Sequence, residues 1–170
     1  MNGNDASPGT VTGSVLVAPN SFKGTLSATL AAAAIERGVM RAAWGGSSEL
    51  VPLADGGDGF VEVLTAASGR RTKHRASGPL GQEVEAEVGW LGEGRTAVIE
   101  LASVSGLALV PRPDPATAAR AGTRGLGQLL EIAAEQGAEE ILVGLGGSAS
   151  TDGGAGLASA LGYHLLDRIG

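Results

Sequence analysis

The stretch "GLGGSASTDGGAGLASALG", Gly144 to Gly162, begins where the apolar run "EEILVGL" ends. A short apolar run closed by glycines predicts a buried strand, and the Ala-rich end of the stretch predicts a helix. The loop between them offers bare backbone suited to a small anion, yet it contains a carboxylate, Asp152. Strand, loop and helix in this order are typical of a parallel α/β sheet.

The composition narrows the class of protein. The chain has 170 residues, 43% of them hydrophobic, which is long enough to bury a core. Glycine accounts for 29 of the 170 residues, well above the usual level of about 7%, and we expect these glycines in turns. The net charge of −6 argues against a nucleic-acid surface, and the absence of cysteine fits a reducing compartment. Because the apolar runs are too short for a membrane span, we expect a cytoplasmic protein without a membrane or nucleic-acid partner.

The first part of the chain alternates predicted strands and helices. The strands are "SVLVAP" and "SELVPL", and each is followed by a loop, "NSFKGTL" and "ADGGDG". Helices are predicted from about Ala28 to Ala43, with Ser27 as the N-cap, and from about Phe60 to Ala67. This order predicts the start of a parallel α/β sheet.

The middle of the chain has a different pattern. In "EVEAEVGWL", apolar residues alternate with glutamates, which predicts an antiparallel strand with one face on a core. "RTAVIELA" is its expected hairpin partner, so a small β-rich insert is predicted. The prolines of "VPRPDP" forbid a continuous helix, and "GTRGLGQLLEIAAEQG" predicts the next one. The predicted segments are a disordered tail (1–13), a first part of the α/β domain (14–68), a β-rich segment (69–112) and an α/β segment with the glycine-rich loop (113–170).

The loop around Asp152 allows two structural interpretations. Gly144, Gly146 and Ala149 match a loose dinucleotide fingerprint, with Asp167 downstream as a ribose contact. That motif, however, needs a helix where this chain has two adjacent glycines, which are poor helix formers. We therefore expect the helix to begin near Gly153, with Asp152 at or beside its N-cap.

Charged residues follow the predicted parallel strands. The carboxyl ends of such strands meet at one edge of a sheet, so we expect Lys23, Asp55, Asp58 and Asp152 to converge. Each has a structural alternative: Lys23 as a solvated loop residue, and the aspartates as helix caps. Convergence favours a site for phosphoryl transfer, which needs a cation, backbone amides and carboxylates for a metal. The expected catalytic residues are Lys23, Asp55 and Asp152; the expected cofactor-binding residues are Gly146, Gly147, Ser148, Ser150 and Arg124; and the expected metal ligands are Asp55 and Asp58. Glu100, at the end of an apolar strand, is expected to face the site or to be a simple strand-end acid.

Several long motifs resemble one family. "VLVAPNSFKGTLSA", "VPLADGGDGFVEVL", "SGPLGQEVEAEVG", "AVIELASVSGLALV" and "LVGLGGSASTDGGAGLASALG" resemble, in this order, the N-terminal half of the bacterial type I glycerate kinase family. The family usually has Asn where this chain has Thr151, and Gly-Thr-Gly-Glu where it has Gly-Leu-Gly-Gln at 125–128. Family members run to roughly twice this length, which implies a truncated two-domain protein that lacks the C-terminal half.

The resemblance implies a mostly parallel sheet of flavodoxin-like character and an enzyme that uses ATP and Mg²⁺. The implied reaction transfers a phosphoryl group to a hydroxyl of D-glycerate and gives 2-phosphoglycerate; 3-phosphoglycerate is the alternative product. Two other functions stay open: a non-catalytic anion- or nucleotide-binding fragment, and a Rossmann-type NAD-binding protein. A homo-oligomer also stays open.

Overall fold

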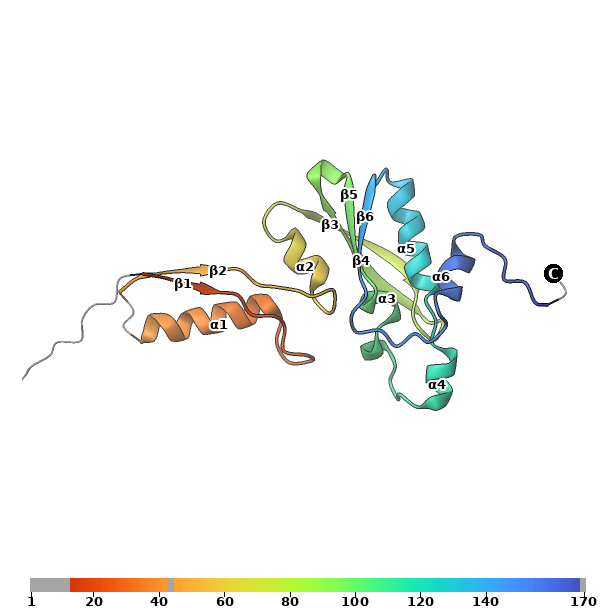
Figure 1. Ribbon diagram of the computed structural model, residues 1–170, viewed down its shortest axis with the longest axis horizontal. Coiled ribbons are helices and arrows are strands. Elements are labelled where there is room, and N and C mark those ends of the chain that lie inside the picture. The colour runs from red at the N-terminus through yellow and green to blue at the C-terminus, as the bar shows by residue number, and fades with distance from the viewer. Residues whose placement is uncertain (1–12, 43–44, 169–170) are drawn as a thin grey trace, which may run out of the picture. The chain divides into compact units, whose positions relative to one another are not determined.

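The computed structural model describes residues 13–42 and 45–168 and divides the chain into two compact units, Met1–Leu53 and Ala54–Gly170. Both are drawn in Figure 1. Apart from Gly13, the tail predicted over 1–13 lies outside the described residues, as does the predicted helix end at Ala43.

The first unit is a β-α-β element. Strands β1 (Ser14–Val17) and β2 (Ser47–Leu50) pair in parallel, with Ser14 opposite Ser47, and helix α1 (Ala28–Arg41) connects them. Ser27 caps α1 as predicted, because its hydroxyl accepts the N–H of Leu30 at 3.3 Å. The parallel pairing predicted for this part of the chain is confirmed.

The second unit contains a four-stranded sheet in the order β3-β4-β5-β6. Antiparallel pairs join β3 to β4 and β4 to β5, whereas β5 and β6 pair in parallel. The predicted hairpin is therefore confirmed, and its second strand is also the parallel partner of β6, so the antiparallel strands and the last strand share one sheet. The strands are β3 (Arg70–Ser77), β4 (Glu83–Leu91), β5 (Thr96–Glu100) and β6 (Glu140–Gly144).

Helices cover both faces of this sheet (Figure 1). On one face, α5 (Arg124–Glu135) and the single turn α3 (Ala102–Ser105) close a core around Trp90 and Ile99. On the other, α2 (Phe60–Thr65) packs over Gly89, where an added Cβ would lie 2.7 Å from the Thr65 methyl carbon. Because α2 packs on β4 and β5, segment 54–68 belongs to the second compact unit.

The remaining elements are short helices and turns. A 3-10 turn, η1 (Gly92–Gly94), joins β4 to β5, and a second, η2 (Leu107–Leu109), follows α3. The short helix α4 (Pro115–Arg120) precedes α5, and α6 (Ala155–Ala160) follows the glycine-rich loop. In the described part of the chain, no helix is both long and apolar enough to cross a bilayer.

Alternation along β4 positions the core as predicted. Ala86, Val88 and Trp90 are buried, whereas the glutamates that alternate with the apolar residues of β4 point outward and pair with basic residues of β3. These pairs are Arg71–Glu87, Lys73–Glu85 and Arg75–Glu83. Exposed ion pairs contribute little stability, so burial of the apolar face is the main stabilising term for this hairpin.

Candidate functional site

The two glycine-rich loops of the second unit, residues 55–59 and 145–153, lie backbone against backbone. The N–H of Gly146 donates to the carbonyl of Gly56 at 2.8 Å. A Cβ added to Gly146 would lie 2.7 Å from the Cα of Gly57, and one added to Gly144 would lie 2.6 Å from the oxygen of Gly56. Only glycine allows so close an approach of two main chains. The structure thus brings together the two loops that carry Asp55, Asp58 and Asp152.

Asp55 and Asp58 are both exposed in the first of these loops. The Oδ1 atom of Asp58 lies 3.5 Å from where a Cβ of Gly147 would be, so this carboxylate sits beside the second loop. Within the described residues, neither carboxylate accepts a hydrogen bond. Both therefore keep their oxygen atoms available for a ligand.

Glu100 ends β5 next to Asp58. Its carboxylate accepts the N–H of Gly59 at 3.0 Å, at the start of α2. Burial raises the pKa of Glu100; the amide of Val61 opposes this shift, and the nearby charge of Asp58 adds to it. Glu100 therefore faces the acidic loop, which is the first of the two expectations for it.

The carboxylate of Asp152 accepts four hydrogen bonds. Its Oδ2 atom accepts the N–H and the hydroxyl of Thr123, at 2.8 and 2.9 Å, and the N–H of Gly156 at 2.9 Å. Its Oδ1 atom accepts the N–H of Gly154 at 3.1 Å. Asp152 therefore joins the first turn of α6 to the start of α5.

These hydrogen bonds determine the charge state of Asp152. Burial works to raise its pKa, but the amides of Gly156, Thr123 and Gly154 together outweigh it, and the pKa is lowered. The negative charge also meets the positive ends of two helices. Asp152 caps the first turn of α6 through the N–H of Gly156, as predicted, although the N-cap position is Gly154, two residues after Asp152. The carboxylate itself fills the space between the amides that surround it.

The start of α6 also bears on the dinucleotide interpretation. Helix α6 begins at Ala155, with Gly154 as its N-cap in a left-handed conformation (φ 87°). Ala149, the third residue of the loose fingerprint, lies in the loop and not in a helix. The loop therefore lacks the helix that a dinucleotide pyrophosphate uses.

Thr123 is the residue that sequence reasoning missed. It is buried, donates its hydroxyl proton to Asp152, and accepts the N–H of Leu157 at 2.9 Å. Its place directly before the α5 helix pattern was a signal for an N-cap, but no local pattern could show that its partners lie about thirty residues away.

Ser148 and Ser150 form the outward part of the second loop. Their hydroxyl oxygens are 2.6 Å apart, and the N–H of Ser150 donates to the Ser148 hydroxyl at 3.0 Å. Gly147 beside them has a left-handed backbone (φ 70°). In the part of the chain that the structure describes, the N–H groups of Gly147 and Ser148 have no acceptor. Two amides and one hydroxyl proton of the serine pair are thus open to an anion, because the other hydroxyl proton is used between the two serines.

The two predicted cations belong to different units. Arg124 is exposed at the first position of α5, directly after Thr123. Lys23 is exposed in the turn after β1, in the first unit, and the structure describes each unit by itself. The loops that carry Asp55, Asp58 and Asp152 are joined within the second unit, and the convergence of the four charged side chains themselves stays a prediction.

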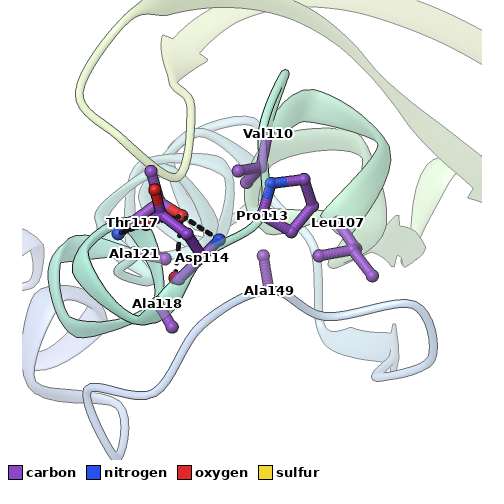
Figure 2. A pocket seen from close by; sticks show the side chains of 8 residues that line it. All are labelled: Leu107, Val110, Pro113, Asp114, Thr117, Ala118, Ala121 and Ala149. Carbon is purple, nitrogen blue, oxygen red and sulfur yellow. Dashed lines mark hydrogen bonds between the residues drawn. The ribbon is translucent and has the colours of Figure 1, made fainter.

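A small pocket lies beside the second loop. It is lined by Leu107, Val110, Pro113, Asp114, Thr117, Ala118, Ala121 and Ala149 (Figure 2). Its volume is about 40 Å³, and most of its walls are apolar. Among the described residues, no three His, Cys, Asp or Glu side chains are grouped as a ready metal site.

Comparison with known proteins gives a consistent result. The model of the glycerate kinase family matches residues 15–170. The chain is 48% identical over 157 residues to a glycerate kinase from Bacillus subtilis (strain 168), and 45% identical over 159 residues to a glycerate 2-kinase from Escherichia coli (strain K12). Each match covers 92% of this chain and 41% of the relative.

A solved structure has the same fold. It is the crystal structure of a protein from Salmonella typhimurium LT2 described as a candidate glycerate kinase 2. It superimposes with a TM-score of 0.73 at 42% identity, over 92% of this chain and 42% of that one. The chain therefore spans about two fifths of the length of the proteins it matches.

Proposed function

Because this chain belongs to the glycerate kinase family, we propose that it contributes to ATP-dependent phosphoryl transfer to a hydroxyl of D-glycerate. The proposed product is 2-phosphoglycerate, and 3-phosphoglycerate is the alternative. A kinase that acts on a small molecule agrees with the names of the relatives. Since the chain spans 41% of those relatives, the proposal concerns the activity of the whole protein.

One observation carries this proposal: the hydrogen bond from Gly146 to Gly56 joins the acidic loop to the loop with open amides and hydroxyls. Phosphoryl transfer needs positioning and charge stabilisation more than covalent chemistry from the protein. A single surface that holds both carboxylates and anion-binding groups meets that need. The mixed α/β fold and the solved structure support the same conclusion.

Asp55 and Asp58 fit the requirements of Mg²⁺. This ion prefers oxygen ligands and binds through one or two carboxylates together with phosphate groups and water. Both side chains are exposed and accept no hydrogen bond from the described residues, so they suit such a role. When bound, Mg²⁺ would neutralise negative charge on the phosphates.

We propose that Gly146, Gly147, Ser148 and Ser150 bind a phosphate or the carboxylate of the substrate. The open amides of Gly147 and Ser148 and the paired hydroxyls support this assignment. Gly146 contributes by fixing the loop, because its own amide already donates to Gly56. Arg124 is proposed as a further anion partner, because its guanidinium is exposed at the first position of α5, directly after the Thr123 that binds Asp152.

Lys23 and Asp152 have different proposed roles. Lys23 is proposed as the cation that stabilises charge on the transferred group. Asp152 was predicted to be catalytic; its four hydrogen bonds favour a role in which it fixes the loop that carries Ser148 and Ser150. In both cases we expect removal of the charge to slow turnover.

The deciding experiment measures ATP consumption with D-glycerate. It compares this chain with a chimera in which the chain is followed by the unmatched C-terminal part of the Bacillus subtilis relative. We expect turnover by the chimera, and a loss of at least ~100-fold in its Lys23→Met and Asp55→Asn variants. Near-normal turnover in either variant would remove that residue from the mechanism, and an inactive chimera beside an active relative would contradict the function.

The alternative is a chain that binds an anion or nucleotide without transferring phosphate. Its coverage of only 41% of the relatives supports this alternative for the chain by itself. Calorimetric titration with ATP separates the two. Binding by this chain without turnover, together with binding and turnover by the chimera, would show that the chain alone is a binding unit.

A further inference from the structure

Helix α4 (Pro115–Arg120) is fixed mainly at its ends. It has six residues, and none of its side chains is buried. A helix this short is not stable in water by itself. At its N-terminus, Asp114 and Thr117 form a capping box, in which the Asp114 carboxylate accepts the N–H of Thr117 at 2.7 Å. The other end needs partners from elsewhere in the fold, because the last carbonyls of a helix have no N–H donor within it.

Thr151 supplies the partners at that end. Its hydroxyl donates to the carbonyl of Ala118 at 2.5 Å, and its N–H donates to the carbonyl of Ala121 at 3.2 Å. Thr151 belongs to the second glycine-rich loop, next to Asp152. One residue of the loop thus closes the C-terminal end of α4 with both a side-chain and a main-chain hydrogen bond.

Packing beneath α4 contributes less than these hydrogen bonds. Figure 2 shows Ala149 on the loop below Pro113, with Ala118 of α4 to its left. The pocket between them has a volume of about 40 Å³, so side chains do not fill the space between α4 and the loop. Atoms that face a cavity lose the dispersion contacts of a close-packed core. The position of α4 relative to the loop therefore depends on Thr151.

We propose that Thr151 is a positioning residue that locks the Ser148–Ser150 segment in place by fastening the loop to α4. The segment is attached before it at Gly147, whose carbonyl accepts the N–H of Leu107 at 2.9 Å, and within it at Ala149, whose N–H donates to the carbonyl of Ser105 at 2.8 Å. Thr151 supplies the attachment directly after it. Its role in binding an anion rests on the proposed function. The single proton of the Thr151 hydroxyl is donated to Ala118, so this hydroxyl acts through the loop and not on a substrate.

The side-chain chemistry at position 151 makes the proposal specific. Valine has nearly the shape of threonine but no hydroxyl, so Thr151→Val removes the side-chain hydrogen bond and keeps the volume. Thr151→Ser and Thr151→Asn each retain a donor that can reach the carbonyl of Ala118. Thr96→Val is a matched control, because the Thr96 hydroxyl donates to Glu140 at the opposite end of the β5–β6 pair.

The first test uses hydrogen exchange of this chain, read on peptides that cover residues 114–121 and 148–152. In Thr151→Val we expect exchange to be roughly fivefold faster in both segments, which corresponds to the loss of one hydrogen bond. Thr151→Ser, Thr151→Asn and Thr96→Val should leave both segments unchanged. Unchanged exchange at 114–121 in Thr151→Val would overturn the proposal that Thr151 fastens the loop to α4. Faster exchange at 114–121 alone would overturn the proposal that Thr151 positions the loop.

The second test uses the active chimera. In Thr151→Val we expect KM for glycerate to rise several-fold with kcat nearly unchanged, and Thr151→Ser to restore it, because a looser loop binds the substrate less well. An unchanged KM alongside faster loop exchange would overturn the link between position 151 and the site. A chimera without any turnover would contradict the proposed function, and the exchange experiment would still decide the role of Thr151.

Discussion

Asp152 and Glu100 are two carboxylates close to the same pair of loops, and their pKa values are shifted in opposite directions. Asp152 accepts four hydrogen bonds as an anion, whereas Glu100 is more deeply buried and lies beside another acid. Burial dominates the pKa of Glu100, whereas the hydrogen-bond donors around Asp152 outweigh its burial. The two residues therefore predict opposite dependences of stability on pH.

Replacing Asp152 by Asn should destabilise the fold at neutral pH. The change leaves the N–H groups around it less well satisfied, at a cost of about 1–3 kcal/mol in the free energy of unfolding. Because the folded protein lowers the pKa of Asp152, its contribution is complete above the ordinary value of 3.8 and is lost as the pH falls through the lower folded value. Urea unfolding of wild type and Asp152→Asn at pH 7, and again in acid, measures the difference.

The matched control is Asp114→Asn, which alters a fully exposed cap of α4. We expect a smaller effect from it than from Asp152→Asn. Equal stabilities of wild type and Asp152→Asn at pH 7 would show that the four hydrogen bonds do not stabilise the fold.

Replacing Glu100 by Gln should have the opposite outcome. The amide oxygen of Gln can still accept the N–H of Gly59, and the buried charge next to Asp58 disappears. Between the ordinary pKa of 4.5 and the raised folded value, the folded protein binds more protons than the unfolded chain, so wild-type stability falls as the pH rises. We expect Glu100→Gln to be at least as stable as wild type at pH 7 in thermal unfolding, and a clear loss of stability would contradict this.

At the scale of elements, the glycines of the two glycine-rich loops differ in how much space they leave for an added Cβ. A Cβ on Gly146 would meet the main chain of Gly57 at 2.7 Å, whereas a Cβ on Gly57 would find its nearest atoms at 3.8 Å or more. Thermal unfolding should therefore show Gly146→Ala destabilised by about 1–3 kcal/mol and Gly57→Ala close to wild type.

Gly38→Ala serves as the control for a glycine that is not constrained. Gly38 lies inside α1, and an added Cβ would meet no atom within 4 Å. Alanine should stabilise this helix by about 0.5–1 kcal/mol. If Gly146→Ala were as stable as Gly38→Ala, the close contact between the loops would not exist in solution.

The elements that the sequence predicted are those with a regular apolar pattern. Alternation predicted β4, and the Ser27 cap with its Ala-rich sequence predicted α1. Strand β3 was missed because "RRTKHRAS" is polar on the face that pairs with the glutamates of β4. Helix α4 was missed because "VPRPDP" reads as a break, although Pro115 occupies the first position of the helix, where its missing N–H costs nothing.

The site was predictable only in part for a similar reason. Asp55, Asp58 and Asp152 could be grouped because each follows a strand in a local motif. The partners of Asp152 could not be found in this way, because Thr123 lies in another element and only the tertiary fold brings it close. The sequence also offered no way to tell a carboxylate that is free for a metal from one that is held by amides.

At the scale of the whole molecule, the second unit has a core cluster of its own. The core cluster around Trp90, Ile99 and Leu129 lies entirely within Ala54–Gly170. We therefore expect a fragment of residues 54–170 to unfold cooperatively, with the fluorescence of a buried tryptophan from Trp90. Leu129→Ala in this fragment should lower its stability by about 2–5 kcal/mol. A fragment without a cooperative transition would show that the second unit needs the first to fold.

The contact between the glycine-rich loops also has a consequence for evolution. A new Cβ at Gly146 would meet main-chain atoms of residues 56 and 57, and one at Gly144 would meet main-chain atoms of Gly56 as well as the ring of Phe60. A second substitution can shrink a side chain, but none can remove main-chain atoms. No compensating mutation is therefore open to these two positions, and we expect them to stay glycine in descendants that keep this fold, while exposed neighbours such as Leu145 drift.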